Sequence, residues 1–182
     1  MERDFTSRKS LFVKPLDLLS RRSVRKYTEE PVEDAMIQIA LEAAMAAPSA
    51  RHCDPWHFIV VKEQVGRDAL ADALPYGQML REAPAGIIVC GDINVAHRNE
   101  LSYLLQDVAA AIENLLLSLE LQGLGAVWLG IHPNEDRIQA VKTAFNLPDN
   151  IIPVSAIALG HPAEFPEART RYDATKVHNG TW

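Results

Sequence analysis

The stretch LLQDVAAAIENLLLSLELQGLGAVWLGI, residues 104–131, predicts a long helix, a tight turn and a strand in immediate succession. Residues 104–122 are apolar over most of the helical circumference, and Gly123 is the expected helix stop because glycine tolerates a left-handed backbone. Gly125 keeps the turn tight before the short apolar run 126–131. This order is the reverse of the Rossmann fingerprint, in which a glycine-rich turn leads from a strand into a helix.

The few polar side chains of the predicted helix are expected to form one narrow stripe. Gln106, Glu113 and Glu120 are seven residues apart, and so are Asp107 and Asn114. A surface helix is ordinarily apolar over about a third of its face. Two interpretations fit: a central helix of a monomer, or a helix that packs on a sheet with one side and on a second subunit with the other. The few elements available in 182 residues favour the dimer. Asp107 is interpreted as a hydrogen-bonded interface or capping residue rather than a catalyst.

The rest of the chain alternates helices with short apolar strands. We expect helices at 16–22, 31–47, 66–74 and 135–145, strands at 57–62, 86–91 and 154–160, and a loop at 146–153. Alternation of this kind predicts one α/β or α+β domain over residues 16–182, with a single sheet covered by helices on both faces. Residues 1–15 are expected to be a loose leader, and the last 20 residues an extended arm.

Charge and composition limit the classes of function. The formal net charge is −6, yet residues 1–27 carry +5 and the remainder −11. A basic head on an acidic body suggests one local anion site rather than a nucleic-acid surface. Two cysteines without CxxC spacing give no disulfide framework, and neither a signal peptide nor an apolar membrane span is evident. A cytoplasmic location without membrane contact is therefore expected, and the histidines show no metal-ligand spacing.

Residues 21–26, RRSVRK, place four cations and a hydroxyl close together. A solvated basic face is one interpretation, and a phosphate site is the other. In an extended segment Ser23 and Arg25 share one side while Val24 faces the other. Guanidinium pairs bidentately with phosphate, and a serine hydroxyl adds a donor. Neither GxxxxGK[ST] nor GxGxxG occurs, so we predict a nucleotide held mainly by side chains.

These residues resemble the FMN-dependent nitroreductase family. The family segment R-R-S-x-R-x-[YF] is present as residues 21–27, and A-P-S-x-x-N-x-Q-P-W-x-F as residues 47–58. Residues 123–125, 128–130 and 160–162 follow in the family's order, and the end of the chain, 169–182, is similar to the smaller members. The resemblance covers about residues 16–182. In two places this chain departs from the pattern, since His52 replaces Asn and Asp54 replaces Gln.

The resemblance implies an α+β fold with one central mixed or antiparallel sheet. It also implies a homodimer with two FMN sites at the interface and a C-terminal arm that crosses to the partner subunit. Residues 21–23 would hold the phosphate and ribityl end together with two arginines of the arm, and Arg25 would lie near the N1/O2 edge of the flavin. Residues 48–50 would come from the other subunit, and the backbone at 129–130 would approach N5. The expected cofactor-binding residues are Arg21, Arg22, Ser23, Arg25, Pro48, Ser49, Ala50, His52, Leu129, Gly130, Arg169 and Arg171.

The implied activity is hydride transfer from NADH or NADPH to a small acceptor such as a nitroaromatic or a quinone, by a ping-pong mechanism. The chemistry would belong to FMN, so no catalytic side chain is expected. Two alternatives stay open: a specialised enzyme of the same fold, such as a reductive dehalogenase or a flavin-cleaving oxygenase, or a flavin-binding protein without turnover. A nucleic-acid module is disfavoured by the acidic remainder of the chain.

Overall fold

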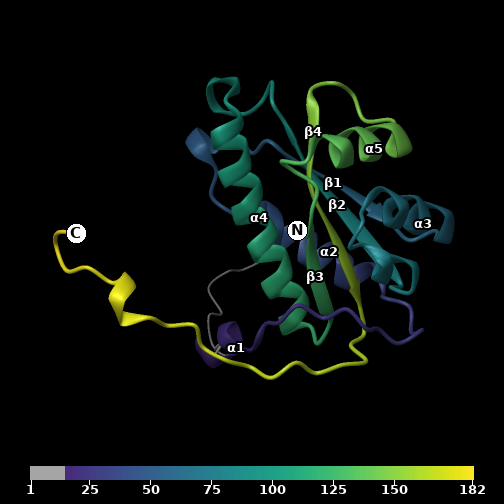
Figure 1. The fold of residues 1–182 in the computed structure, drawn as a ribbon, viewed down its shortest axis with the longest axis horizontal. Helices are drawn as coiled ribbons and strands as arrows, with labels where there is room; N and C mark the ends of the chain where they lie inside the picture. Colours follow the sequence, from purple (N-terminus) through teal and green to yellow (C-terminus); the bar gives the residue numbers. More distant parts are fainter. Residues whose placement is uncertain (1–14) are drawn as a thin grey trace, which may run out of the picture.

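The computed structural model describes residues 15–182 as one sheet with helices on both faces (Figure 1). The elements in chain order are α1 (Pro15–Ser20), α2 (Asp34–Met45), β1 (Trp56–Val61), α3 (Gln64–Ala73), β2 (Ala85–Asp92), α4 (Leu101–Leu121), β3 (Gly125–Gly130), α5 (Glu135–Phe145) and β4 (Ile151–Gly160). Short 3₁₀ turns occur at Ala50–His52, Gln78–Arg81, His97–Asn99 and Ala174–Lys176. The predicted leader lies outside the described residues, except for Pro15, which begins α1. No helix among residues 15–182 is long and apolar enough to cross a bilayer.

The four strands form one antiparallel sheet in the order β1-β2-β4-β3. The predicted α+β class with a single sheet is confirmed. The loop predicted at 146–153 is wrong at its end, because β4 begins at Ile151 and includes Pro153. The register shifts between Val89 and Cys90 of β2 at this point, so that Cys90 lies opposite Pro153 and Val89 opposite Ser155. A bulge accommodates a proline, which has no N–H to donate to the ladder.

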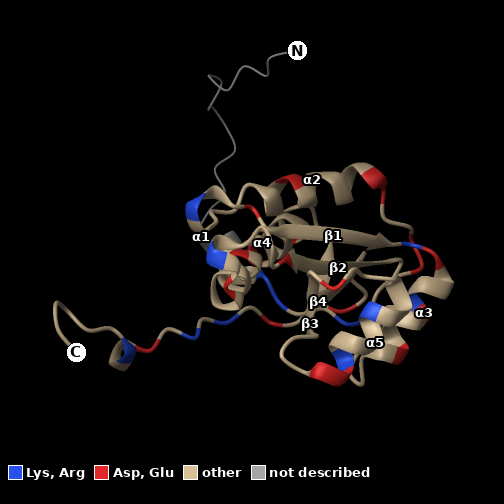
Figure 2. Cartoon of the chain, turned by 90° about the horizontal axis from the view of Figure 1, so that it is seen from above, with Lys and Arg blue, Asp and Glu red and all other residues tan. Residues whose placement is uncertain are grey.

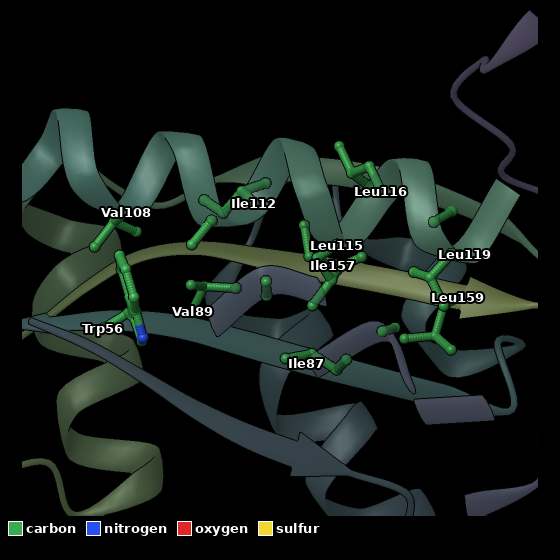
Figure 3. Packing of buried hydrophobic residues seen from close by; sticks show 14 of the residues in the cluster. Trp56, Ile87, Val89, Val108, Ile112, Leu115, Leu116, Leu119, Ile157 and Leu159 are labelled. Carbon is green, nitrogen blue, oxygen red and sulfur yellow. The ribbon is translucent and has the colours of Figure 1, made fainter. Parts of the chain in front are cut away.

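Each face of the sheet carries its own hydrophobic core. Helices α2 and α4 cover one face, and α3 and α5 cover the other (Figure 2). In Figure 3, α4 places Val108, Ile112 and Leu115 above β2 and β4, where Val89 and Ile157 meet them. Burial of each such side chain stabilises the fold by about 1.5–3 kcal/mol, so this row fixes α4 on the sheet. The predicted burial of both sheet faces is confirmed.

The polar side chains of α4 lie on two faces of the helix rather than in the one stripe expected from the sequence. Asn114 Nδ2 donates to the carbonyl of Ala43 at 3.1 Å, so this face meets α2. Asp107 lies seven residues earlier on the same face, whereas Gln106 and Glu113 are exposed. Successive helical residues are rotated by about 100°, so positions 106 and 107 begin separate rows. The expectation of a single stripe was wrong for this reason.

Candidate functional site

The basic segment at residues 21–27 runs along the outer edge of β3. The N–H of Val24 donates to the carbonyl of Ala126 at 3.0 Å, and Ser23 forms a parallel bridge with Ala126. Gly125 allows this close approach, because a Cβ there would lie 2.7 Å from Val24 Cγ1. Val24 is buried while Arg25 is exposed, as the alternation of an extended segment predicts. Arg25 is therefore presented to solvent beside β3.

Tyr27 fixes the end of this segment. Its hydroxyl lies 2.6 Å from the carbonyl of Val24 and 3.0 Å from that of Ala158. Burial raises the pKa of the Tyr27 phenol well above its ordinary value, because the charged form would be poorly solvated. The phenol therefore stays protonated and continues to donate to the main chain. The segment that carries Arg25 is consequently held at both ends.

Beyond Ala126, the outer edge of β3 has no strand partner within the described chain. The carbonyl of Ala126 points outward to Val24, so by alternation Trp128 and Gly130 present their N–H groups to the same edge. A Cβ at Gly130 would meet nothing closer than the His132 carbonyl at 3.9 Å. At Gly91 and Gly160, by contrast, a Cβ would lie 2.5 Å from a neighbouring side chain. The internal packing of the chain therefore does not explain the missing side chain of Gly130, which leaves space for a ligand against the backbone.

A cavity of about 230 Å³ lies against this edge. Three of its lining residues belong to the predicted cofactor set, namely Arg25, Leu129 and Gly130. The others are Leu74, Pro75, Tyr76, Trp128 and Arg137. Apolar and aromatic walls with a few convergent polar groups are typical of a small-molecule site. A flat ligand with an electron-rich edge fits the donors of this arrangement, which are the guanidinium groups and the backbone N–H groups, while the Gly130 carbonyl already accepts from Arg137.

The two arginines that precede Ser23 have different partners. The guanidinium of Arg22 donates to the carbonyls of Leu19 and Arg21 at 3.0 and 2.7 Å. It also donates to two carbonyls of the C-terminal arm, at Glu167 (3.0 Å) and Arg169 (2.6 Å). Arg21 instead lies 3.6 Å from Glu113 of α4. Arg22 thus holds the arm so that Arg169 lies next to the 21–23 segment, while Arg171 is exposed further along the arm.

The predicted loop residues Pro48, Ser49, Ala50 and His52 lie apart from these groups, and none of them lines the cavity. The N–H of Ala50 donates to Asp107 at 2.8 Å, whereas Ser20 Oγ lies 2.9 Å from Glu120 Oε1. These two contacts are 13 residues apart on α4, or roughly 20 Å at the helical rise. One chain therefore brings together the arginine segment, the arm and the β3 edge, but not the 48–52 loop.

The 48–54 loop has an unusual backbone. Arg51, His52 and Asp54 have φ values of 58°, 55° and 48°. This left-handed region is uncommon for residues other than glycine, and among them asparagine, aspartate and histidine adopt it most often. Ser49 Oγ bonds to the Asp54 carboxylate, and the N–H of Asp54 donates back to Ser49 Oγ at 3.1 Å. The two departures from the family pattern thus fall at positions with a left-handed backbone, and Asp54 closes the loop through Ser49.

The two cysteines of the chain are free and have different surroundings. Cys53 is half-buried in the 48–54 loop, and Cys90 is buried in β2. Burial raises the pKa of the Cys90 thiol to about 12. Cys90 is therefore a small core residue rather than a nucleophile. Among residues 15–182 no group of three or more His, Cys, Asp or Glu side chains could hold a metal ion.

Sequence analysis did not identify Tyr76 and Arg137 as site residues. Arg137 is in the first turn of α5, where its N–H donates to the side chain of the capping residue Asn134 at 3.2 Å. Acidic residues are usual in the first turn of a helix, where the backbone N–H groups favour negative charge. The basic residue at this position was therefore the one feature of the sequence that could have marked Arg137 as a candidate site residue. Tyr76 carries no sequence signal, because it lies in a loop and the residue is 77% exposed.

The fold and the β3-edge cavity define an α+β protein with a small cavity beside a basic segment, and the comparisons assign its family. The model of the "Nitroreductase family" matches residues 18–76 and 72–161. The chain therefore belongs to the nitroreductase family.

Individual relatives are similar over nearly the full chain. One from Methanothermobacter thermautotrophicus, whose name assigns it as an NADH dehydrogenase or NAD(P)H nitroreductase, is 40% identical over 90% of this chain and 84% of its own length. A structure of the same assignment from Parabacteroides distasonis is 39% identical, with a TM-score of 0.86 over 92% of this chain and 97% of that one. A nitroreductase complex with FMN from Desulfovibrio desulfuricans is 30% identical, with a TM-score of 0.78 over 92% and 96% of the two chains.

Proposed function

We propose that this chain is an FMN-dependent oxidoreductase that passes hydride from NADH or NADPH to a small acceptor such as a nitroaromatic or a quinone, and that it works as a homodimer. The observation that carries the proposal is the space at Gly130, on an open strand edge whose N–H groups face the same cavity as Arg25. Similarity to nitroreductases over about nine-tenths of the chain supports the reaction class.

The residues at hand fit FMN. Arg21 and Ser23, with Arg169 and Arg171 of the arm, would hold the phosphate and ribityl end, and Arg22 would keep the arm in place. Arg25 would contact the N1/O2 edge, and the backbone at Leu129 and Gly130 would lie against N5. When bound, FMN supplies the hydride chemistry that connects the donor with the acceptor.

The chain's own residues bind and shield rather than transfer protons. Leu74 and Pro75 contribute apolar surface to the cavity that Arg25 also lines. Arg25 is exposed in the single chain, so its electrostatic effect on the cavity would strengthen when a bound ligand displaces the surrounding water. No acid or base side chain is required when the cofactor carries the hydride, and the titratable side chains among the lining residues are Tyr76 and the two arginines.

A second copy of the chain would complete the site. The 48–52 loop belongs to the predicted flavin contacts. It contacts α4 at Asp107, whereas the arginine segment lies near Glu120, and these two positions are roughly 20 Å apart at the helical rise. The C-terminal arm leaves the body of its own subunit (Figures 1 and 2), with Phe165 86% and Trp182 100% exposed. Large apolar side chains exposed on the α1, α2 and α4 surface are Leu18, Leu19, Ile39, Met45, Leu101 and Leu121. Exposed apolar surface of this kind is typical of an interface.

We place the protein in the cytoplasm, where free thiols such as Cys53 persist.

The proposal is tested on the purified protein by absorption spectroscopy and by mass spectrometry of the released ligand. We expect a yellow protein that releases FMN on denaturation and oxidises NAD(P)H when a nitroaromatic is added. A protein that contains FAD, or that contains no flavin and does not bind added FMN, would contradict the proposal.

A further inference from the structure

The guanidinium of Arg137 is held at the rim of the β3-edge cavity by two contacts. Its Nη1 donates to the carbonyl of Gly130 at 2.9 Å, and its Cζ lies 5.9 Å from the centroid of the Tyr76 ring. These contacts come from β3 on one side and from the loop after α3 on the other. A cation above an aromatic ring is attracted to its electron-rich face. These two contacts therefore fix the Arg137 side chain, which projects from the first turn of α5.

The contacts of Arg137 leave most of its donors available. A guanidinium has five N–H groups, and within residues 15–182 only Nη1 makes a hydrogen bond. No acidic side chain lines the cavity with it; the remaining lining residues are apolar, aromatic or arginine. Arg25 and Arg137 thus give the cavity two positive charges without a carboxylate among its walls. Tyr76 (77% exposed) and Trp128 (38% exposed) add aromatic surface at its opening.

Resting on the proposed function, we propose that Arg137 and Tyr76 form a recognition element for an anionic substituent on the aromatic molecule that reacts at the flavin. The guanidinium binds a carboxylate or a phosphate, and the Tyr76 ring holds the guanidinium toward the cavity. Arg25 is assigned to the flavin edge, so Arg137 is the cation available to the substrate. Two sources share this chemistry: a carboxylate on the acceptor, or the phosphates of the nicotinamide donor.

The two sources can be distinguished because the donor reduces the flavin in one half-reaction and the acceptor reoxidises it in the other. For the acceptor, 4-nitrobenzoate is compared with neutral 4-nitrobenzamide in reoxidation of the reduced protein by stopped flow. For the donor, NADH is compared with N-benzyl-1,4-dihydronicotinamide, which has no phosphate. Binding is measured independently by titrating the oxidised holoprotein with unreactive benzoate and benzamide and following the flavin absorbance.

We expect Arg137→Gln to weaken the anionic member of at least one pair by roughly ten-fold or more, while the neutral member changes little. Arg137→Lys keeps the charge and should retain part of the discrimination. Tyr76→Leu should lower the discrimination less than Arg137→Gln. Lys62→Gln is the matched control, because Lys62 follows β1 at the opposite edge of the sheet and pairs with Asp34.

A different pattern would overturn the proposal. If Arg137→Gln slows charged and neutral substrates equally, Arg137 only supports the Gly130 backbone. If it changes neither rates nor benzoate binding, the cation has no role in recognition. Failure of the wild-type protein to bind FMN or to oxidise any donor would instead contradict the proposed function, so the two failures are distinguishable.

Discussion

The carboxylate of Asp107 accepts a 2.8 Å hydrogen bond from the N–H of Ala50 and so joins the middle of α4 to the 48–54 loop. Asp107 and Ser155 are the buried polar residues of the described chain, and Asp107 Oδ2 has no hydrogen-bond partner within it. One oxygen therefore positions the loop, while the other oxygen is buried without a hydrogen-bond partner among the described residues. The hydrogen-bonded role predicted for Asp107 is confirmed by this contact.

The first prediction separates these two properties of Asp107. Asp107→Asn keeps a carbonyl oxygen for Ala50 and removes the charge, so the free energy of unfolding should stay close to that of the wild type. Asp107→Leu leaves the Ala50 N–H without a partner and should cost about 1–3 kcal/mol. Urea unfolding measures both variants, and amide exchange at Ala50 should be faster only in the leucine variant. Equal stability of the two variants would show that the bond does not hold the loop.

The second prediction contrasts the two ends of the proposed flavin site. Reduced FMN carries more negative charge at N1/O2 than the oxidised ring, and a guanidinium at that edge stabilises it. Arg25→Ala removes a charge-assisted bond worth about 1.5–3 kcal/mol. For a two-electron couple, about 1.4 kcal/mol corresponds to roughly 30 mV, so the reduction potential should fall by some tens of millivolts. Arg21→Ala should weaken FMN binding with little change in potential.

Redox titration and FMN affinity are measured on both of these variants. The partly exposed Arg21–Glu113 pair contributes little stability, so Arg21→Ala should still fold. If Arg21→Ala shifts the potential and Arg25→Ala only weakens FMN binding, the two ends of the flavin are reversed. If neither variant changes either quantity, residues 21–26 are a solvated basic face.

The third prediction concerns the C-terminal arm. Deletion of residues 163–182 removes Arg169 and Arg171 together with the exposed aromatic side chains, so both dimer and FMN affinity should decrease. Deletion of residues 178–182 alone keeps both arginines and should leave FMN affinity near the wild-type value. Analytical ultracentrifugation and flavin fluorescence report the two properties. A stable wild-type monomer at micromolar concentration that still holds FMN would contradict the dimer.

The fourth prediction follows from a single cavity at the Gly130 edge. Donor and acceptor would occupy the same place in turn, so double-reciprocal plots with NAD(P)H and a quinone should be parallel. The measurement is a steady-state matrix of both substrates, with product inhibition by NAD(P)⁺ as a check, since it should compete with the acceptor. Intersecting lines would indicate a ternary complex and a second substrate site.

Local sequence patterns were sufficient to predict most of the fold. The strand at 86–91 and the helix at 135–145 were predicted because apolar periodicity and helix-ending residues are local properties. β4 was predicted too short, since the bulge that admits Pro153 depends on the register with β2. Two rows of polar side chains on α4 were predicted as one, because the seven-residue spacing within each row was read without the rotation of about 100° between positions 106 and 107.

Candidate site residues could be predicted from the sequence only where they belong to a family motif. Arg25 and Gly130 both belong to the predicted cofactor set and line one cavity, although they are 105 positions apart in the sequence. Their contact with FMN stays a prediction. Tyr76 and Arg137 meet through the packing of α3 against α5, which no local pattern shows. The left-handed backbone at His52 was also unforeseen, because neither glycine nor asparagine marks it.

The strand order has a consequence for biosynthesis. β3 pairs only with β4 in the sheet, and β2 has β4 as its second neighbour, yet β4 is the last strand to leave the ribosome. Until residues 151–160 emerge, the nascent chain exposes one edge of β2, and the apolar strand β3 has no strand partner. Unpaired apolar edges are where partly folded chains aggregate. Truncated translation products that end before residue 151 should therefore depend on chaperones, whereas products that extend beyond residue 160 can close the sheet.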